Sequence, residues 1–204
     1  ITGDQALVIT AALDNDVVTI DGSAATGALT FTTGTGTVTS TGGSAADTIT
    51  SGSGNNSLTG NAGADTFNFA ATEFTTDDTI SGGAGTDVIK IETANTNETI
   101  VLADFTNVST VETLTAGTTT GLAGNLGALA STAGINTVTF ADTGTDDVLT
   151  IDAEFANDLT VNLGGGTAVD TLDASAYTKT LTVAATEVFF DAADHVITGG
   201  TGTA

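Results

Sequence analysis

The sequence predicts an all-β fold, and for its central part a parallel β-solenoid, in which short strands wind into stacked coils. Three observations predict this fold class. The chain of 204 residues contains 46 Thr and 26 Gly but no Pro; Thr favours strands, and Gly favours tight turns. Its apolar clusters are short and mostly lie 9 to 12 residues apart. A nine-residue pattern also occurs three times without a gap over residues 42–68.

The apolar clusters mark the expected strands. In chain order they are residues 7–9, 17–20, 29–31, 49, 58, 67, 80, 88–91, 100–102, 111–114, 138–140, 148–151, 159–163, 172, 181–183 and 195–197. Such spacing predicts short strands with a turn between each pair, as in a sandwich or a solenoid. The nine-residue register favours a solenoid over 42–90. The period drifts in the second half, where a β-solenoid and a sandwich-like section both fit.

We therefore expect two β-rich sections, residues 1–99 with the repeats and residues 100–204 as a probable continuation of the coil. One segment interrupts the strand pattern. Residues 121–132 place Leu122, Leu126 and Leu129 at helical spacing, but the segment also contains three glycines, which disfavour a helix. A short helix and an apolar loop both fit this segment, which would mark a joint between the sections.

The charge of the chain excludes several classes of function. The formal net charge is -23, from 25 acidic residues against Lys90 and Lys179. Nucleic-acid binding requires clustered cations, so DNA, RNA and anionic membranes would repel this chain. Its natural small partners are cations, and hard divalent ions prefer carboxylate and carbonyl oxygens. The sequence has no Cys, so it forms no disulfides, and no apolar run approaches the roughly 20 residues of a transmembrane segment.

The nine-residue pattern has the form GGxGxDxUx, where U is a large apolar residue. It is read from GGSAADTIT (42–50), SGSGNNSLT (51–59), GNAGADTFN (60–68), GGAGTDVIK (82–90) and GGTAVDTLD (165–173). Residues 73–81, EFTTDDTIS, keep Asp78 sixth and Ile80 eighth but lose the glycines. An acid or amide thus stands sixth, and an apolar residue eighth, in every copy.

Each position of the pattern has a physical role. Glycines allow the positive φ of a tight turn, the acid supplies a hard oxygen ligand, and U points into the core. In the RTX family, which this pattern resembles, two repeats form one coil, so the resemblance implies that repeats 18 residues apart stack and place Asp47 and Asp65 about 5 Å apart, one strand spacing. A divalent cation between the turns converts their repulsion into attraction and makes binding part of the folding free energy. The alternative is an ordinary β-solenoid with Gly-Asp turns and no metal.

The repeats resemble the RTX calcium-binding nonapeptide, and the resemblance implies a β-roll with Ca²⁺ bound at its turns. The predicted metal ligands are Gly42, Ser44, Asp47, Ser51, Ser53, Asn56, Gly60, Ala62, Asp65, Asp78, Gly82, Ala84, Asp87, Gly165 and Asp170. The chain departs from the family pattern at Ala45, Asn56 and Asn61, and Asn56, a neutral ligand, predicts a weaker site. The repeat at 165–173 lacks its fourth glycine and stands alone, so its site is the least supported.

Other acidic groups are less informative. The pairs Asp77–Asp78 and Asp146–Asp147 can supply ligands, but such pairs are more often solvated turn residues. Asp104 is expected in a turn. Asp14 and Asp16 resemble half of a calcium loop, but no Gly follows at the sixth place of an EF-hand.

Catalysis is not expected in this chain. It has one Tyr, no Trp and no Arg to orient a substrate, and no nucleophile elbow, phosphate loop or dinucleotide fingerprint. Its single His, His195, is expected to be structural or solvent-facing.

Two further stretches, FTNVSTVETLTAG (105–117) and NDLTVNLGGGTAVDTLDAS (157–175), are similar to repeats of RTX-bearing bacterial surface-layer proteins. This resemblance implies a secreted, extracellular or cell-surface structural protein, exported by type I secretion and folded by external calcium. Its expected partners are copies of itself, in a lattice or filament, and a cell-surface polysaccharide. The alternatives are a module of a large RTX adhesin, and the RTX tail of a secreted toxin or hydrolase. Because the sequence contains no Met, we expect it to be a piece of a longer chain.

Overall fold

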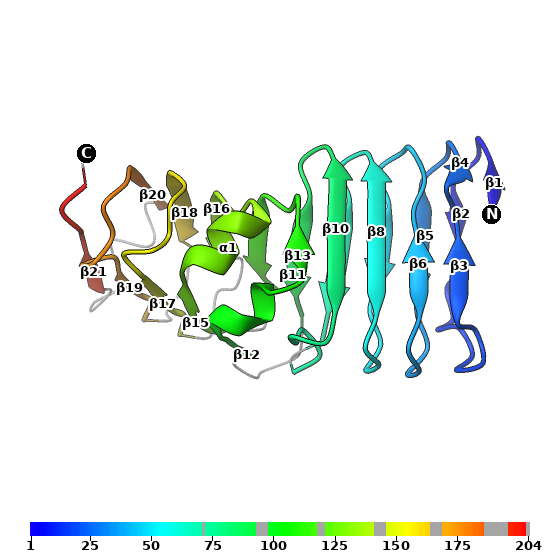
Figure 1. Ribbon diagram of the computed structural model, residues 1–204, viewed down its shortest axis with the longest axis horizontal. Helices are drawn as coiled ribbons and strands as arrows, with labels where there is room; N and C mark the ends of the chain where they lie inside the picture. The colour runs from blue at the N-terminus through cyan, green and yellow to red at the C-terminus, as the bar shows by residue number, and fades with distance from the viewer. Residues whose placement is uncertain are drawn as a thin grey trace.

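The computed structural model describes residues 1–70, 72–92, 98–117, 121–140, 146–163, 169–185 and 196–202. The chain runs along one sheet, turns, returns along a facing sheet and turns again, so that the coils stack into an elongated body (Figure 1). The strands of the described residues pair in parallel throughout. The predicted all-β parallel solenoid is confirmed, and the second half follows it rather than a sandwich.

One wall of the solenoid is a nine-stranded sheet that runs the length of the body. Its order is β2-β5-β7-β9-β11-β14-β16-β18-β20. The strands are β2 (Leu7–Val8), β5 (Leu29–Thr32), β7 (Thr48–Thr50), β9 (Thr66–Phe69), β11 (Val88–Ile91), β14 (Thr113–Ala116), β16 (Thr137–Phe140), β18 (Leu159–Leu163) and β20 (Leu181–Ala185).

Two five-stranded sheets share the opposite wall. The N-terminal one has the order β13-β10-β8-β6-β3, with β3 (Thr19–Asp21), β6 (Thr39–Thr41), β8 (Ser57–Ala62), β10 (Thr79–Ala84) and β13 (Val108–Ser109). The C-terminal one has the order β12-β15-β17-β19-β21, with β12 (Glu98–Ile100), β15 (Leu122–Leu126), β17 (Val148–Ile151), β19 (Thr171–Asp173) and β21 (Val196–Thr198). A small sheet of β1 (Thr2–Gly3) and β4 (Ala24–Ala25) completes the N-terminal end.

The core consists of straight rows of apolar side chains, one from each coil. Parallel pairing in constant register stacks the inward residues of successive strands, because strand side chains alternate between the two faces. In the nine-stranded sheet this row is Phe31, Ile49, Phe67, Ile89, Leu114, Val138 and Val161, each 2% exposed or less. The facing row contains Leu58 and Ile80. The eighth residue of each described repeat therefore points into the core, as predicted.

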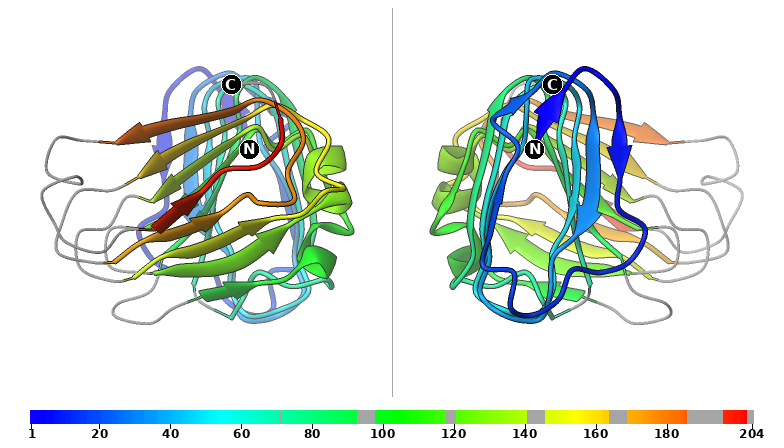
Figure 2. Two further views of the ribbon diagram at one scale, coloured as in Figure 1. Left: turned by 90° about the vertical axis from the view of Figure 1, so that its left-hand side faces the viewer. Right: turned by 90° about the vertical axis from the view of Figure 1, so that its right-hand side faces the viewer.

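Two short helices lie at one edge of the coils (Figure 2). They are η1 (Leu102–Phe105), a 3₁₀ helix, and α1 (Ala128–Ala133). The sequence expectation for 121–132 is therefore corrected. Leu122 and Leu126 are core residues of a strand, β15, and the helix begins only after Gly127. A strand is possible because leucines four residues apart share a face in a strand as well as in a helix.

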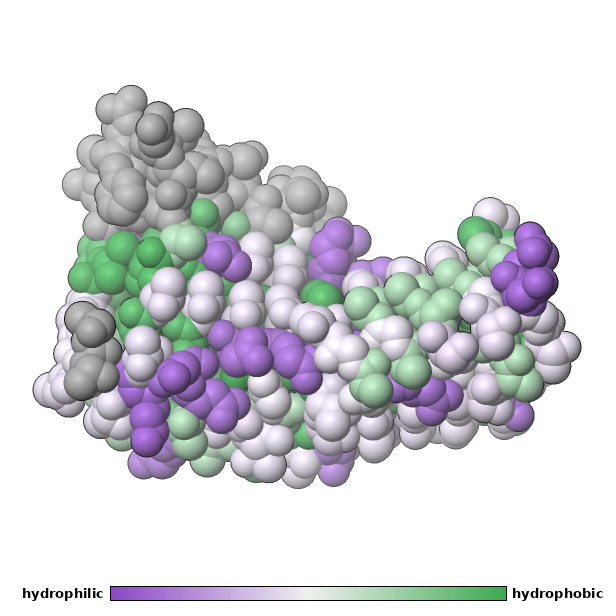
Figure 3. All heavy atoms as spheres, turned by 90° about the horizontal axis from the view of Figure 1, so that it is seen from above, coloured by the Kyte–Doolittle hydropathy of each residue, from purple (hydrophilic) through white to green (hydrophobic). Residues whose placement is uncertain are grey.

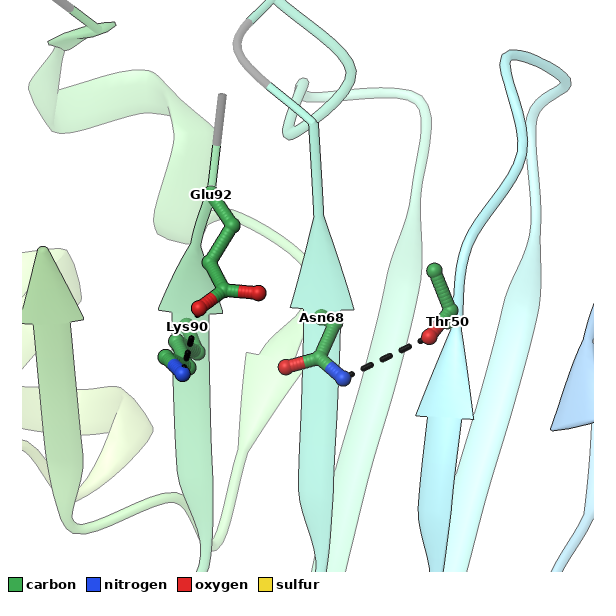
Figure 4. A network of polar contacts seen from close by, with 4 residues as sticks. All are labelled: Thr50, Asn68, Lys90 and Glu92. Atoms are coloured by element: carbon green, nitrogen blue, oxygen red, sulfur yellow. Dashed lines mark hydrogen bonds and ion pairs between the residues drawn. The ribbon is translucent and has the colours of Figure 1, made fainter. Parts of the chain in front are cut away.

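The outward face of the nine-stranded sheet is polar. Thr50, Asn68 and Lys90 occupy one register position on β7, β9 and β11. Figure 4 shows that the Asn68 amide donates to Thr50 Oγ1 over 3.3 Å, and that Lys90 pairs with Glu92 of its own chain segment at 2.5 Å. Threonines fill most other positions of this face, which explains the Thr-rich composition.

The nine-stranded sheet continues past the predicted boundary between residues 99 and 100, because β11 pairs with β14. The boundary falls inside β12, the first strand of the C-terminal five-stranded sheet, and β13 of the N-terminal five-stranded sheet follows it in the chain. The division of the chain into two sections stays a prediction. Of the described helices, neither has the length and hydropathy that a membrane-spanning segment requires.

Ser40 offers a test of the core. It lies between Ile20 and Leu58 in the inward row of the N-terminal five-stranded sheet, and its buried Oγ has no hydrogen-bond partner. Because an unpaired buried hydroxyl costs about 1 kcal/mol or more, we expect Ser40→Ala to raise the free energy of unfolding by about 1 kcal/mol. Urea unfolding in saturating calcium measures this change.

The matched control is Ser57→Ala on the neighbouring strand, whose side chain is half-buried. We expect the control to change the free energy of unfolding by less than about 0.5 kcal/mol. A clear loss of stability in Ser40→Ala would contradict the packing described here.

Candidate metal sites

Three acid-bearing turns stack at one edge of the solenoid, along the upper rim in Figure 1. We call this the 47–87 edge, and it consists of turns 42–47, 60–65 and 82–87. Each turn leads into the next strand of the nine-stranded sheet, and Thr48, Thr66 and Val88 at the strand starts are in register. The register brings the sixth residues, Asp47, Asp65 and Asp87, into one column. All three are 1% exposed or less.

One oxygen of each carboxylate accepts a hydrogen bond from a main-chain N–H group of the previous coil. Asp47 Oδ1 accepts from Leu29 N at 2.7 Å, and Asp65 Oδ1 accepts from Asp47 N at 2.7 Å. Asp87 Oδ1 accepts from Asp65 N at 2.8 Å. Glu112 extends the column by accepting from Asp87 N at 2.8 Å. The column is thus a ladder of side-chain to main-chain hydrogen bonds, which we call the acid ladder.

The second oxygen of the acids lies in a different environment. Asp65 Oδ2 and Asp87 Oδ2 are buried and accept no hydrogen bond from the described residues. In the first turn, Asp47 Oδ2 accepts from Gly43 N at 2.5 Å. A buried carboxylate oxygen without a donor is costly unless a cation satisfies it.

The first glycine of each turn forms a cradle for these oxygens. A Cβ atom at Gly60 would lie closer than 3.0 Å to both Asp65 Oδ2 and the carbonyl oxygen of Gly82 in the next coil. Gly42 has the same two neighbours, Asp47 Oδ2 and the Gly60 carbonyl oxygen. A carboxylate oxygen and a carbonyl oxygen therefore converge on each of these glycines.

The reason for the glycines is thus partly different from the predicted one. Positive φ occurs at the second and fourth positions of the turns, at Asn61, Gly63, Gly83 and Gly85. The first-position glycines have no positive φ, and Gly60 and Gly82 belong to strands β8 and β10. They are required because any side chain would meet the oxygens of the cradle.

Burial and mutual repulsion change the acidity of the column. Burial raises the pKa of Asp65 to about 6, and the charges of Asp87 and Asp47 act in the same direction, against a hydrogen bond from Asp47 N. Burial also raises the pKa of Asp87, with a contribution from the charge of Glu112. The ionised column is therefore under strain without a counter-charge, which a bound cation supplies.

The residues at this edge fit calcium. Calcium takes roughly six to eight hard oxygen ligands from carboxylates and carbonyls, and both kinds converge at the turn glycines. No three acidic or His side chains come close enough together in the described part of the chain to form a site by themselves. A calcium ion bound here would take most of its ligands from main-chain carbonyls, and Asp47, Asp65 and Asp87 would supply the charge.

Of the predicted third-position ligands, Ala62 and Ala84 could offer an ion only a main-chain carbonyl, whereas Ser44 also has a hydroxyl, and the main chain of all three takes part in coil stacking. Ser44 N donates to Ala25 O, Ala62 N donates to Gly43 O, and Ala84 O accepts from Gly63 N. The predicted Gly42 carbonyl accepts from the Asn61 amide at 2.8 Å. A carbonyl oxygen has two lone pairs, so these bonds leave one for a cation.

The remaining predicted ligands lie elsewhere. Ser51, Ser53, Asn56 and Asp78 lie at the opposite edge of the coil. Asp170 is buried in the C-terminal half, and its Oδ1 accepts from Asp147 N at 3.1 Å. Gly165 lies outside the described residues, as does His195.

A second acid ladder in the C-terminal half was not predicted. Asp147 is fully buried, and its Oδ1 accepts from Leu122 N at 2.5 Å. The main-chain N–H of Asp147 in turn donates to Asp170 Oδ1. The expectation that acidic pairs are mostly solvated is therefore wrong for Asp147 and Asp78, although Asp146 and Asp77 are exposed. Asp104, expected in a turn, is a buried residue of η1 and accepts from Val101 N.

A signal for the missed residues exists in the sequence. Asp147 and Glu112 each stand two residues before an inward Leu, as the sixth and eighth positions of the repeats do. The pattern acid-x-apolar therefore marks the ladder even where the glycines are missing.

A methyl group placed in the cradle tests its role. We expect Gly60→Ala to weaken calcium binding and to lower the free energy of unfolding by about 1 to 3 kcal/mol, because the added Cβ overpacks two oxygens. The calcium concentration at the midpoint of folding, followed by circular dichroism, measures the effect. Gly199→Ala is the control, since its Cβ would have no neighbour within 4 Å. Equal effects of the two variants would rule out the cradle.

The raised pKa of Asp65 predicts an unusual pH dependence for the calcium-free protein. Because the pKa is about 6 in the folded state, against 3.8 for the model carboxyl, the folded state binds the proton more tightly. Stability is therefore highest below the unfolded pKa and is lost as the pH rises through about 6. In chelator, we expect a higher melting temperature near pH 5 than near pH 7.5, measured by differential scanning calorimetry.

Asp65→Asn removes this titration, so its melting temperature should vary less over the same pH range. A calcium-free protein that becomes steadily more stable from about pH 5 to about pH 7.5 would contradict the assignment.

Comparison with known proteins agrees with this geometry. The family profile described as the RTX calcium-binding nonapeptide repeat matches four copies, over residues 41–71 and 75–90. Comparisons with curated proteins and with solved structures found no match. The matched residues contain all three acids of the 47–87 edge. Residues 41–71 and 75–90 are therefore RTX calcium-binding repeats, and the ion that such repeats bind is calcium.

Proposed function

We propose that this chain is a calcium-stabilised structural module of a secreted bacterial protein, and that it assembles with copies of itself into a surface layer, an extracellular matrix or a filament. RTX repeats are typical of secreted proteins. The observation that carries the proposal is the exposure of apolar strands at both ends of the coil stack.

At the N-terminal end, β2 is the first strand of the nine-stranded sheet, and Leu7 on it, in register with the core residue Leu29, is 39% exposed. At the C-terminal end, β21 is the last strand of its sheet, and Ile197 on it, in register with the core residue Leu172, is 41% exposed. A strand at the end of a sheet offers unpaired N–H and C=O groups to a further strand. Two copies placed end to end would continue the parallel sheets and cover these side chains.

The surface between the ends is less suited to association. Figure 3 shows that apolar surface on the visible face gathers toward the C-terminal end, while the middle of the stack is mixed or polar. With a formal charge of -23, the sides of two copies repel each other. End-to-end growth would cover the apolar residues of the end strands and keep the acidic sides of the copies apart, and calcium at the turns would reduce the charge repulsion further.

Calcium also provides a reason for assembly outside the cell. Extracellular modules commonly bind calcium with dissociation constants of about 0.1 to 1 mM. Without calcium the acid ladder carries uncompensated buried charge, which disfavours the folded coil. Folding and exposure of the strand ends would thus follow export into a calcium-rich medium.

Two other functions belong to the same proposal as alternatives. As a module of an RTX adhesin, the chain would bind a surface or glycan ligand without self-assembly. As the RTX tail of a toxin or hydrolase, it would support a catalytic part in a parent chain. For the chain itself we propose no enzymatic activity, and a cell-surface polysaccharide as the anchoring partner.

Calcium titration of the chelated chain tests assembly. We expect the far-UV circular dichroism signal of β-structure and the light scattering to rise together, because the same ion folds the coil and forms its ends. A rise in β-structure while the chain remains monomeric at high concentration would exclude self-assembly and leave the adhesin and tail functions.

A pair of variants locates the contact. Leu7→Lys places a charge at the exposed end of the inward row and should abolish the scattering while the circular dichroism response is kept. Thr137→Lys places the same charge on the outward face of β16, which lies inside the sheet between β14 and β18, and should leave end-to-end assembly intact. The opposite result would assign assembly to the sides of the stack.

A further inference from the structure

We propose that calcium binds along only one edge of the solenoid, and that on the opposite edge the side-chain amide of Asn56 takes the place of the ion. This opposite edge, the 56–78 edge, consists of turns 33–38, 51–56 and 73–78, and follows the lower rim in Figure 1. The inference rests on calcium binding at the 47–87 edge and is independent of self-assembly.

Asn56 is the counterpart of Asp65 in the neighbouring repeat, and it is 2% exposed. Its Oδ1 accepts from Val38 N at 3.0 Å, which is the same ladder bond that Asp65 Oδ1 makes with Asp47 N. The Oδ1 atom of the sixth residue therefore accepts the ladder hydrogen bond on both edges.

The two edges differ in the other terminal side-chain atom, which is Nδ2 in Asn56 and Oδ2 in Asp65. Asn56 Nδ2 donates to Ser51 Oγ at 2.9 Å, to the Gly52 carbonyl at 3.0 Å and to the Gly54 carbonyl at 2.6 Å. Three oxygens of the turn thus point at an N–H donor instead of a cation. Asp65 has an oxygen at the equivalent place, and that oxygen has no donor.

The orientation of the Asn56 amide follows from its partners. Reversing it would place its NH₂ group against the Val38 N–H donor and its oxygen against the carbonyl oxygens of Gly52 and Gly54, and none of these contacts would be a hydrogen bond. Of the present partners, only the Ser51 hydroxyl can also donate, so the reversed amide would lose at least three hydrogen bonds and keep at most one. An amide held in this way presents no oxygen to the centre of the turn, so it cannot serve as the weak ligand that the sequence suggested.

The rest of the 56–78 edge is also satisfied without an ion. Asp78 Oδ1 accepts from Asn56 N at 2.9 Å, and its Oδ2 accepts from Thr75 N at 3.1 Å and from Thr75 Oγ1 at 3.3 Å. Val38, at the sixth position of turn 33–38, has no ligand atom in its side chain. The buried carboxylate oxygens that lack a donor in this half of the chain belong to Asp65 and Asp87, on the other edge.

The two edges therefore respond differently to calcium removal. Chelation should loosen the 47–87 edge, whose acids then repel one another, while the 56–78 edge keeps its internal hydrogen bonds. Asn56 decides this difference because replacing its NH₂ group by an oxygen recreates the arrangement of Asp65.

Calcium stoichiometry of the full chain, measured by isothermal titration calorimetry, tests the proposal. We expect Asn56→Asp to bind about one more ion per chain than the wild type, and to lose β-structure in chelator. Asn68→Asp is the matched control, because it adds the same charge on the outward face of β9, and it should bind the wild-type number of ions. An unchanged stoichiometry in folded Asn56→Asp, or a lost ion in Asn56→Ala, would overturn the proposal.

Hydrogen exchange of the wild-type chain gives a test that needs no variant. On addition of chelator, we expect the backbone amides of Asp47 and Asp65 to exchange roughly tenfold faster or more, while those of Val38 and Asn56 keep their protection. Equal loss on both edges would overturn the one-edge proposal. A chain that binds no calcium at all would instead remove the metal basis of the proposed function.

Discussion

The hydrogen bond from a main-chain N–H to the side chain of the sixth residue in the next coil is the interaction on which the solenoid depends. Strand pairing alone fixes neighbouring strands within a sheet, but it does not fix the turns that join the two walls. The acid ladder fixes them, because each carboxylate reaches the amide one coil below. The same bond recurs in the C-terminal half at Asp147 and Asp170, where the coils are less regular.

This interaction also creates the chemistry of the protein. A carboxylate that accepts a ladder hydrogen bond through one oxygen also buries its other oxygen. This second oxygen lies close to the carboxylate of the neighbouring coil, and the two charges repel each other. The chain resolves this conflict in two ways. At the 47–87 edge the charges remain, and an ion from the medium balances them. At the 56–78 edge the chain itself satisfies the second atom, because oxygens of the turn accept from the Asn56 NH₂ group and Thr75 donates to Asp78. One scaffold position thus gives an ion-dependent or an ion-independent coil according to a single side chain.

The periodic part of the fold could be predicted from the sequence because every coil repeats the same pattern of turn and core residues. The apolar eighth residues, such as Ile49 and Phe67, could be assigned to the core from spacing alone. Strand β6 could not be found in this way, because its inward residue is Ser40 and it contains no apolar side chain. Leu122 and Leu126 have a spacing that fits a helix and a strand equally, and only pairing with neighbouring coils decides between them.

The site was predictable to a similar degree. The residues in the acid column followed from the nine-residue period, but the partners of their oxygens depend on neighbouring coils and on side-chain orientation. Asn56 is an example, since the nine-residue period places it sixth in its repeat but does not show which of its two side-chain atoms faces the oxygens of the turn.

The constant parallel pairing of neighbours has a mechanical consequence. Each ladder bond joins residues 18, 18, 22 and 25 positions apart in successive coils, so no contact of this kind connects distant parts of the chain. Tension along the body would therefore detach one coil at a time from an end, and each detached coil would release a length of about 60 to 90 Å. Coils clamped by an ion would resist longer than the others. A tether built from this chain would yield in steps under load, and its stiffness would follow the calcium content of the surrounding water.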